Sequence, residues 1–135
     1  EIREQVGAEN IFIFGLQAHE VTSLKARGYA PETFVASNPD LARTLDMIDS
    51  GYFSPANVFD GKPIVGRLLS DGEPFLVLAD FAAYARAQDE VDALYLQPDE
   101  WSRKAVLNSL GMGTFSSDRS IREYAERIWR IKPVL

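Results

Sequence analysis

The sequence contains no cysteine and only one histidine among its 135 residues. The missing thiols exclude disulfide bonds, thiolate metal sites and cysteine nucleophiles, and they are compatible with a reducing, cytosolic setting. A single histidine also excludes a metal site built from several imidazoles. These absences remove several common routes to catalysis and metal binding.

Basic residues are in the minority, with 14 lysines and arginines against 20 aspartates and glutamates, for a net charge of −6. They are also spread along the chain rather than clustered into a patch. Nucleic acids and anionic membranes attract proteins through basic patches. We therefore expect neither of them as a partner.

Long apolar runs are missing as well. Apolar runs such as Ile11–Phe14 and Phe75–Ala79 are far shorter than the roughly 20 residues needed to span a bilayer. The chain begins at Glu1 without a basic-then-apolar signal segment, and we interpret this start as a trimmed or excised end. A hydrophobic content of 46% is typical of a globular protein. Its length predicts one domain over residues 1–135, with no internal boundary.

The order of elements predicts an α/β fold that is rich in helices and poor in strands. Uninterrupted apolar residues at 11–14, closed by Gly15, and at 75–78 are typical of strands buried on both faces of a parallel sheet. Periodicity and capping signals predict five to seven helices, which include 18–27, 39–49, 63–69, 81–94, one from 98 and one from 117 or 118. Because a central parallel strand needs neighbours on both sides, this pattern indicates missing chain.

The stretch Gly-Met-Gly-Thr-Phe-Ser-Ser-Asp at 111–118 has the composition of a phosphate-binding loop. Such loops follow a strand or lie between two strands, whereas here a helix precedes the glycines. We therefore favour a helix that ends at Gly111 or Gly113 and a new helix capped by Ser117 or Asp118. The alternative is a free-standing module that binds phosphate or another anion at the new helix N-terminus, through Ser116, Ser117 and Asp118.

Other residues with possible chemistry have simpler structural interpretations. His19 has no nucleophile near it in the sequence and is expected on the surface of its helix. Asp80 follows a predicted strand, and we expect it to cap the next helix. Five aromatic residues that could stack against a sugar are expected in the core instead: Tyr29, Tyr52, Trp101, Tyr124 and Trp129. We predict no catalytic, cofactor-binding or metal-binding residue in this sequence.

Short motifs along the whole chain identify a possible family. They include Glu9-Asn-Ile-Phe-Ile-Phe-Gly15, Ser50-Gly-Tyr-Phe-Ser-Pro55, Leu78-Ala-Asp-Phe81, Val91-Asp-Ala-Leu-Tyr95, Phe115-Ser-Ser-Asp-Arg119 and Ile121-Arg-Glu-Tyr-Ala125. In this order and spacing the chain closely resembles the C-terminal end of the α-glucan phosphorylases, which are the glycogen, starch and maltodextrin phosphorylases.

The resemblance implies a fold of two Rossmann-like domains of the GT-B type that face each other across a cleft. It also implies pyridoxal 5′-phosphate as cofactor and the cleavage of α-1,4-glucan by phosphate to give glucose 1-phosphate. Residues 1–135 would be the C-terminal portion of the cofactor-bearing domain. The parent enzyme would be cytoplasmic, homodimeric and allosterically controlled.

The same resemblance implies that the catalytic groups lie outside this chain. The family's cofactor lysine stands in a Gly-Thr-Gly-Asn-Met-Lys context, which none of the four lysines here shares: Lys25, Lys62, Lys104 and Lys132. We therefore expect no cofactor on this segment, no activity when it is isolated, and the rest of the same polypeptide as its partner. An isolated segment would expose the apolar stripe of its last helix and pair with itself. That stripe comprises Ile121, Tyr124, Ile128 and Trp129.

Overall fold

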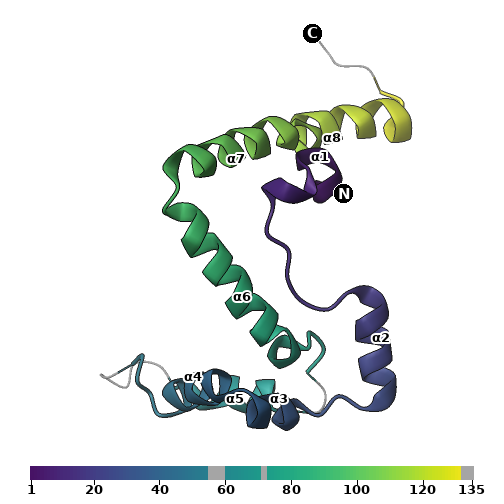
Figure 1. The fold of residues 1–135 in the computed structure, drawn as a ribbon. Coiled ribbons are helices and arrows are strands. Elements are labelled where there is room, and N and C mark those ends of the chain that lie inside the picture. Colours follow the sequence, from purple (N-terminus) through teal and green to yellow (C-terminus); the bar gives the residue numbers. More distant parts are fainter. Residues whose placement is uncertain (55–59, 71–72, 132–135) are drawn as a thin grey trace. The chain divides into compact units, whose positions relative to one another are not determined.

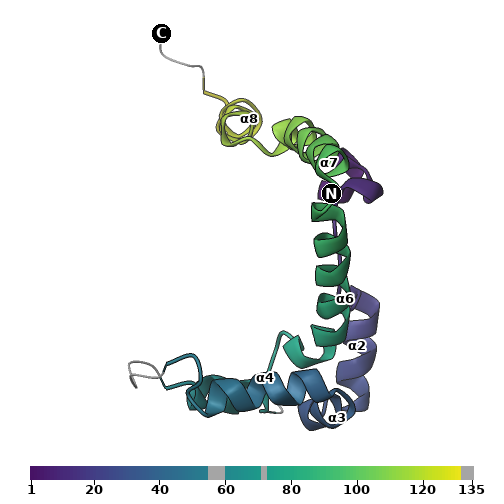
Figure 2. The ribbon, with the colours of Figure 1, turned by 60° about the vertical axis from the view of Figure 1, so that its left-hand side comes forward.

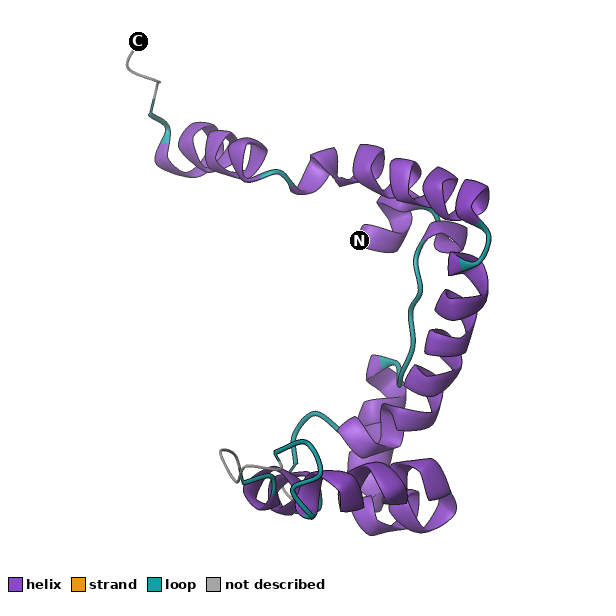
Figure 3. Cartoon of the chain, turned by 90° about the vertical axis from the view of Figure 1, so that its left-hand side faces the viewer, coloured by secondary structure: helices purple, strands orange, loops and turns teal. Residues whose placement is uncertain are grey.

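A computed structural model describes residues 1–54, 60–70 and 73–131, and every regular element among them is helical (Figure 3). The chain divides into two compact units. The middle unit is Phe14–Asp89, and the terminal unit combines Glu1–Ile13 with the chain from Glu90 onward. Residues 55–59, 71, 72 and 132–135, which include Lys132, lie outside the described residues.

The middle unit contains α2 (Ala18–Arg27), α3 (Pro31–Ser37), α4 (Pro39–Asp49), α5 (Lys62–Leu68) and the first part of α6 (Val77–Tyr95). Local sequence signals set their ends. The backbone N–H of Leu41 donates to Asn38 Oδ1 at 3.1 Å, which caps α4 one residue before its proline. Gly28, with φ +90°, follows α2. The predicted α2 and α4 are confirmed, whereas α3 was not predicted.

Side chains from three helices form the core of the middle unit. Leu41 and Leu45 of α4, Val65 of α5 and Leu78 of α6 are buried together. Contacts join α3 to α4 and α4 to α5, which lie together in Figures 1 and 2. Burying each of these side chains contributes about 1.5–3 kcal/mol, so this cluster is the main stabilising feature of the unit.

The terminal unit contains α1 (Ile2–Val6), the 3₁₀ turn η1 (Ala8–Asn10), the last residues of α6, α7 (Pro98–Gly111) and η2 (Met112–Phe115). It continues with α8 (Ser117–Glu123) and a π-helical turn, η3 (Tyr124–Trp129). The short α1 packs against α7 and η2 (Figure 1). The sequence predicted α7 and α8, and it gave no prediction for α1.

The two predicted strands are not found among the described residues, and the Rossmann-like sheet is therefore not part of this structure. Ile11 has extended backbone (φ −140°, ψ 138°), but no described strand lies beside it. A strand is stabilised by hydrogen bonds to a neighbouring strand, which this chain does not supply in its described parts. The helix-rich character of the prediction is confirmed.

At the second predicted strand, residues 75–78, a helix begins instead. The buried Glu73 carboxylate accepts the N–H of Phe75 (2.6 Å) and the N–H of Val77 (3.0 Å), the first residue of α6. Leu76 adopts φ +58° and is only 1% exposed. These local hydrogen bonds and the burial of Leu76 favour a tight corner followed by a helix over an isolated strand.

The predicted helix end among the glycines of residues 111–118 is confirmed, because α7 ends at Gly111. The capping residue is Met112 rather than a glycine, and Gly111 has a further role in packing. A Cβ atom at Gly111 would lie 2.8 Å from Val6 Cγ1 and 3.0 Å from the Gln5 carbonyl oxygen. A Cβ at Gly113 would meet nothing within 4 Å. Gly111 is therefore required for the close packing of α1 on α7.

We predict that Gly111→Ala destabilises the terminal unit, because the new methyl group forces α1 away from α7 at a cost of about 1–3 kcal/mol. The matched control is Gly113→Ala, which has open space and gains about 0.4–1 kcal/mol from the lower entropy of the unfolded chain. Urea unfolding followed by circular dichroism measures both. Equal free energies of unfolding for the two variants would contradict this role.

Candidate functional site

The first candidate is the turn at Ser116–Asp118, where a helix was predicted to start. α8 begins at Ser117, and Ser116 rather than Ser117 or Asp118 is the cap: its Oγ accepts the N–H of Arg119 at 3.3 Å. The Arg119 side chain donates to the Thr114 carbonyl and pairs with Glu123 at 2.6 Å. The Ser116 hydroxyl and the N–H of Arg119 are therefore used within the chain, as at an ordinary helix start.

The second candidate is an open pocket of about 800 Å³ beside α2, in the middle unit. His19, Glu20 and Arg27 line it, and His19 is exposed as predicted. The Ser23 hydroxyl also lines the pocket, but it donates to the backbone carbonyl of His19 (2.8 Å) rather than to the imidazole. The arrangement therefore does not pair the hydroxyl with a general base.

In the described parts of the chain, no group of three or more acidic or histidine side chains is arranged to hold a metal ion. None of the helices described here combines the length and apolar character needed to cross a bilayer.

Asp80 does not cap α6, because the helix begins three residues earlier, at Val77. Its Oδ1 instead accepts the N–H of Leu16 at 2.7 Å, across 64 residues of sequence. Gly15 has φ +89°, and a Cβ there would lie 2.7 Å from Asp80 Oδ2. Asp80 thus fixes the chain directly after residues 11–14, a structural role that the sequence did not predict.

The five aromatic residues do not form one sugar platform. Tyr29 and Tyr52 belong to the middle unit, and the others to the terminal unit. The expected burial is wrong for three of them: Tyr52 is 66% exposed, Trp129 55% and Tyr124 48%. Their ring contacts are mostly local in sequence, such as Tyr124 with Trp129 at 6.0 Å. These rings lack a partner surface in the described chain.

Tyr29 has a raised pKa. Burial raises the pKa of its phenol above the ordinary value of 10.0, and the negative charge of Glu73 raises it further. The backbone amides of Leu78 and Ala79 partly offset this rise in pKa. The phenol oxygen is buried, and these two amides lie near it without forming a hydrogen bond of standard geometry. Its environment therefore favours the neutral phenol.

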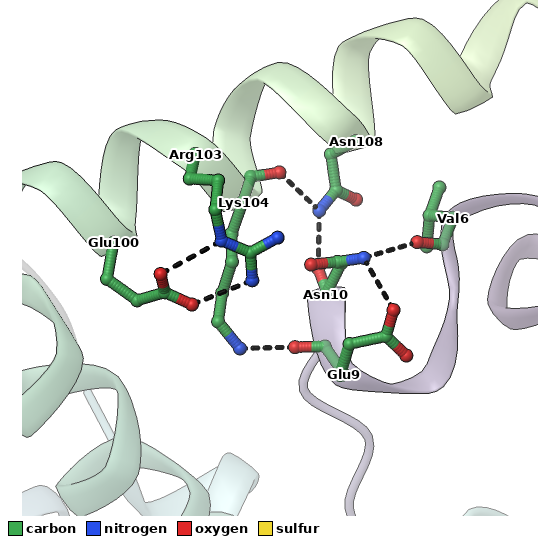
Figure 4. A network of polar contacts seen from close by, with 7 residues as sticks. All are labelled: Val6, Glu9, Asn10, Glu100, Arg103, Lys104 and Asn108. Atoms are coloured by element: carbon green, nitrogen blue, oxygen red, sulfur yellow. Dashed lines mark hydrogen bonds and ion pairs between the residues drawn. The ribbon is translucent and has the colours of Figure 1, made fainter.

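A network of polar contacts joins α7 to the chain before residues 11–14 (Figure 4). Asn108 Nδ2 donates to the carbonyl of Asn10, and Lys104 Nζ donates to the carbonyl of Glu9. Asn10 is buried, and its Nδ2 donates to the Val6 carbonyl at 2.7 Å. We call Lys104 and Asn108 the α7 clamp, because they hold two consecutive carbonyl groups.

An apolar pocket of about 300 Å³ lies between the α7 clamp and the chain that it holds. The sequence did not indicate this site, since Asn10 and Asn108 are 98 residues apart and neither belongs to a motif with known chemistry. The pocket is lined by Asn10, Ile11, Phe12, Leu94, Trp101, Lys104, Ala105 and Asn108.

Neither of these two pockets contains a recognisable catalytic arrangement. The class of protein follows instead from similarity to known sequences. The family described as Carbohydrate phosphorylase matches residues 1–131, and the chain belongs to this family. It is 48% identical to a glycogen phosphorylase of Synechocystis sp. over 135 residues, and 43% identical to that of Chlamydia pneumoniae over 131. The brain form of glycogen phosphorylase from Homo sapiens is 43% identical over 133 residues.

These alignments cover 100%, 97% and 98% of the chain, respectively. The chain spans only about 16% of the length of each of these relatives. It therefore corresponds to a segment of a glycogen phosphorylase, and the resemblance noted from the motifs is confirmed.

We predict that Tyr29→Phe changes how stability depends on pH. The raised pKa means that the folded state holds the phenol proton more tightly than the unfolded state does, so wild-type stability falls as the pH rises above about 10. The variant lacks this loss, and at pH 7 it gains up to about 1 kcal/mol by removing a buried, unpartnered hydroxyl. Urea unfolding at pH 7 and pH 10.5 measures both effects, with the exposed Tyr52→Phe as control. Parallel pH profiles for wild type and Tyr29→Phe would contradict the assignment.

Proposed function

We propose that this chain is the C-terminal structural segment of the cofactor-bearing domain of an α-glucan phosphorylase. The complete cytoplasmic enzyme would use phosphate and pyridoxal 5′-phosphate to release glucose 1-phosphate from an α-1,4-glucan. The supporting observation is that the family match covers residues 1–131, while the chain spans about 16% of its relatives. The segment would supply packing surfaces, and the reacting groups would lie elsewhere in the polypeptide.

The surroundings of the described lysines support the placement of the cofactor and the reacting groups elsewhere in the polypeptide. Lys25 Nζ donates to the Pro74 carbonyl at 3.0 Å, and Lys104 Nζ donates to the Glu9 carbonyl. Lys62 is exposed at the first position of α5. A lysine that forms a Schiff base needs a pocket that lowers its pKa and holds the aldehyde. These three lysines have structural or solvent-exposed surroundings, which is why we place the cofactor outside this segment.

The apolar stripe on the last two helical elements supports a role within a larger protein. Ile121 is 55% exposed, Ile128 65% and Trp129 55%. Soluble monomers rarely expose contiguous apolar surface of this kind, and such patches mark interaction sites. We infer that the rest of the phosphorylase polypeptide covers the stripe. Homodimer formation and allosteric control would likewise depend on the remaining chain.

A chimera tests this function. This chain replaces the matching segment of the Synechocystis glycogen phosphorylase, and we expect glucan phosphorolysis within about tenfold of the parent rate, or ~1.4 kcal/mol in activation free energy. The same enzyme without the segment is the control, and we expect it to be inactive because its apolar surfaces are uncovered. The 135-residue chain alone, mixed with pyridoxal 5′-phosphate, should show neither Schiff-base absorbance nor phosphorolysis. Activity of the isolated chain would exclude a purely structural role.

The exposed stripe also predicts that the isolated chain associates with itself. Ile128→Asp places a charge in the stripe and should shift the chain toward monomer in light scattering at high concentration, because burying an unpaired carboxylate costs several kcal/mol. Ser117→Asp adds the same charge at an exposed position outside the stripe and should leave association unchanged. A wild-type chain that is monomeric at high concentration would contradict the prediction.

A further inference from the structure

Two aromatic side chains are exposed next to each other directly after α4, in the middle unit. Tyr52 and Phe53 are each 66% exposed, and their ring centroids lie 5.2 Å apart with 86° between the ring planes. We call these two residues the aromatic pair. Ile64, which is 44% exposed, lines a hollow together with Phe53 and extends the apolar surface. Contiguous apolar surface of this kind marks a binding site, whereas single exposed apolar residues do not.

Local hydrogen bonds fix the backbone that carries the aromatic pair. Gly51 has φ +77°, and its N–H donates to the Ile48 carbonyl at 3.3 Å. The N–H of Tyr52 donates to the Met47 carbonyl at 3.1 Å, which completes a Schellman motif at the end of α4. In this motif the residue at the position of Tyr52 commonly packs back on its helix, whereas here most of the ring is exposed. A ring presented on a fixed backbone loses little conformational entropy when a ligand stacks on it.

Apolar and polar groups adjoin the aromatic pair. The hollow beside Phe53 has a volume of about 160 Å³. Two exposed polar residues, Asp49 and Ser50, come directly before Gly51 in the sequence. Binding sites for small molecules combine an apolar, aromatic surface with a few polar groups that orient the ligand. The aromatic pair and its neighbours have this composition. The hollow is lined by Ile48, Gly51, Phe53, Ser54 and Ile64.

The charge of the chain narrows the class of ligand. A net charge of −6 repels nucleic acids and anionic membranes, but it does not repel a neutral molecule. The C–H groups on the face of a glucose ring carry partial positive charge, and they pack against the negative face of an aromatic ring. The hydroxyl groups at the edge of the sugar stay hydrated or bond to polar side chains. A neutral oligosaccharide therefore matches the aromatic pair in both shape and charge.

We propose, on the basis of the α-glucan phosphorylase function proposed above, that Tyr52 and Phe53 bind an α-1,4-glucan by stacking against successive glucose units. The two rings stand nearly at right angles. This arrangement suits a chain whose sugar rings turn relative to one another, as they do in a coiled α-1,4-glucan. A β-1,4-glucan is a flat ribbon, and it would contact only one of the two ring faces.

Titration of the 135-residue chain with maltoheptaose, followed by the aromatic NMR signals of Tyr52 and Phe53, tests this site. We expect saturable shifts of both signals. Tyr52→Ala and Phe53→Ala should each weaken binding about three- to tenfold, because each removes one stacking contact. Tyr52→Phe keeps the ring and should bind like the wild type. Phe75→Ala is the matched control, since it removes an 80% exposed ring elsewhere in the middle unit.

Cellohexaose tests the choice of the α-linked polymer. It should bind the 135-residue chain at least about tenfold more weakly than maltoheptaose, because it loses one of the two ring contacts. Equal affinities for the two oligosaccharides would overturn the proposal. Unchanged maltoheptaose binding in both Tyr52→Ala and Phe53→Ala would overturn it as well, as would an equal loss of binding in Phe75→Ala.

The outcomes separate this inference from the proposed function. An active chimera, together with a 135-residue chain that does not bind maltoheptaose, contradicts the site at the aromatic pair and leaves the function standing. Binding of maltoheptaose through Tyr52 and Phe53, together with an inactive chimera, supports the site and contradicts the function.

Discussion

The shared burial of Leu41, Leu45, Val65 and Leu78 is the interaction on which the middle unit depends. Two of the three helices that contribute to this cluster, α4 and α5, are too short to be stable alone in water, since isolated helices below about 12–15 residues are marginal. α4 has 11 residues and α5 has seven. Packing, rather than helix propensity, therefore holds these elements in place. Among the described residues of the terminal unit there is no comparable apolar cluster, and polar contacts to α7 contribute more to holding its elements together.

The sequence predicted those features whose causes are local. The cap at Asn38, the glycine after α2 and the start of α8 depend on residues within three or four positions, which a pattern can capture. The strands at 11–14 and 75–78 depend on neighbours that the described chain does not provide. At residues 75–78 the run of apolar side chains predicted a strand. A helix forms there instead, because the Glu73 carboxylate accepts the N–H of Val77, the first helical residue.

The candidate site was less predictable than the fold for a related reason. The glycines of residues 111–118 suggested a phosphate-binding loop. In the structure Gly111 allows α1 to pack closely on α7, and Ser116 caps α8. The contacts that organise the chain near Ile11 come instead from Asn108 and Lys104, almost a hundred residues away. An asparagine and a lysine on a helix surface carry no sequence signature. Only the packing of α1 and η1 on α7 gives them partners.

The hydrogen bond between Leu16 and Asp80 has a consequence for how the chain is divided. Together with the ring contact between Phe14 and Tyr84, at 5.2 Å, it brings the beginning and the end of the middle unit together. A region whose two ends lie close to each other can be inserted into, or removed from, a host domain without a long linker. Residues 14–89 thus form a unit that is closed near both of its ends, although α6 continues beyond it into the terminal unit.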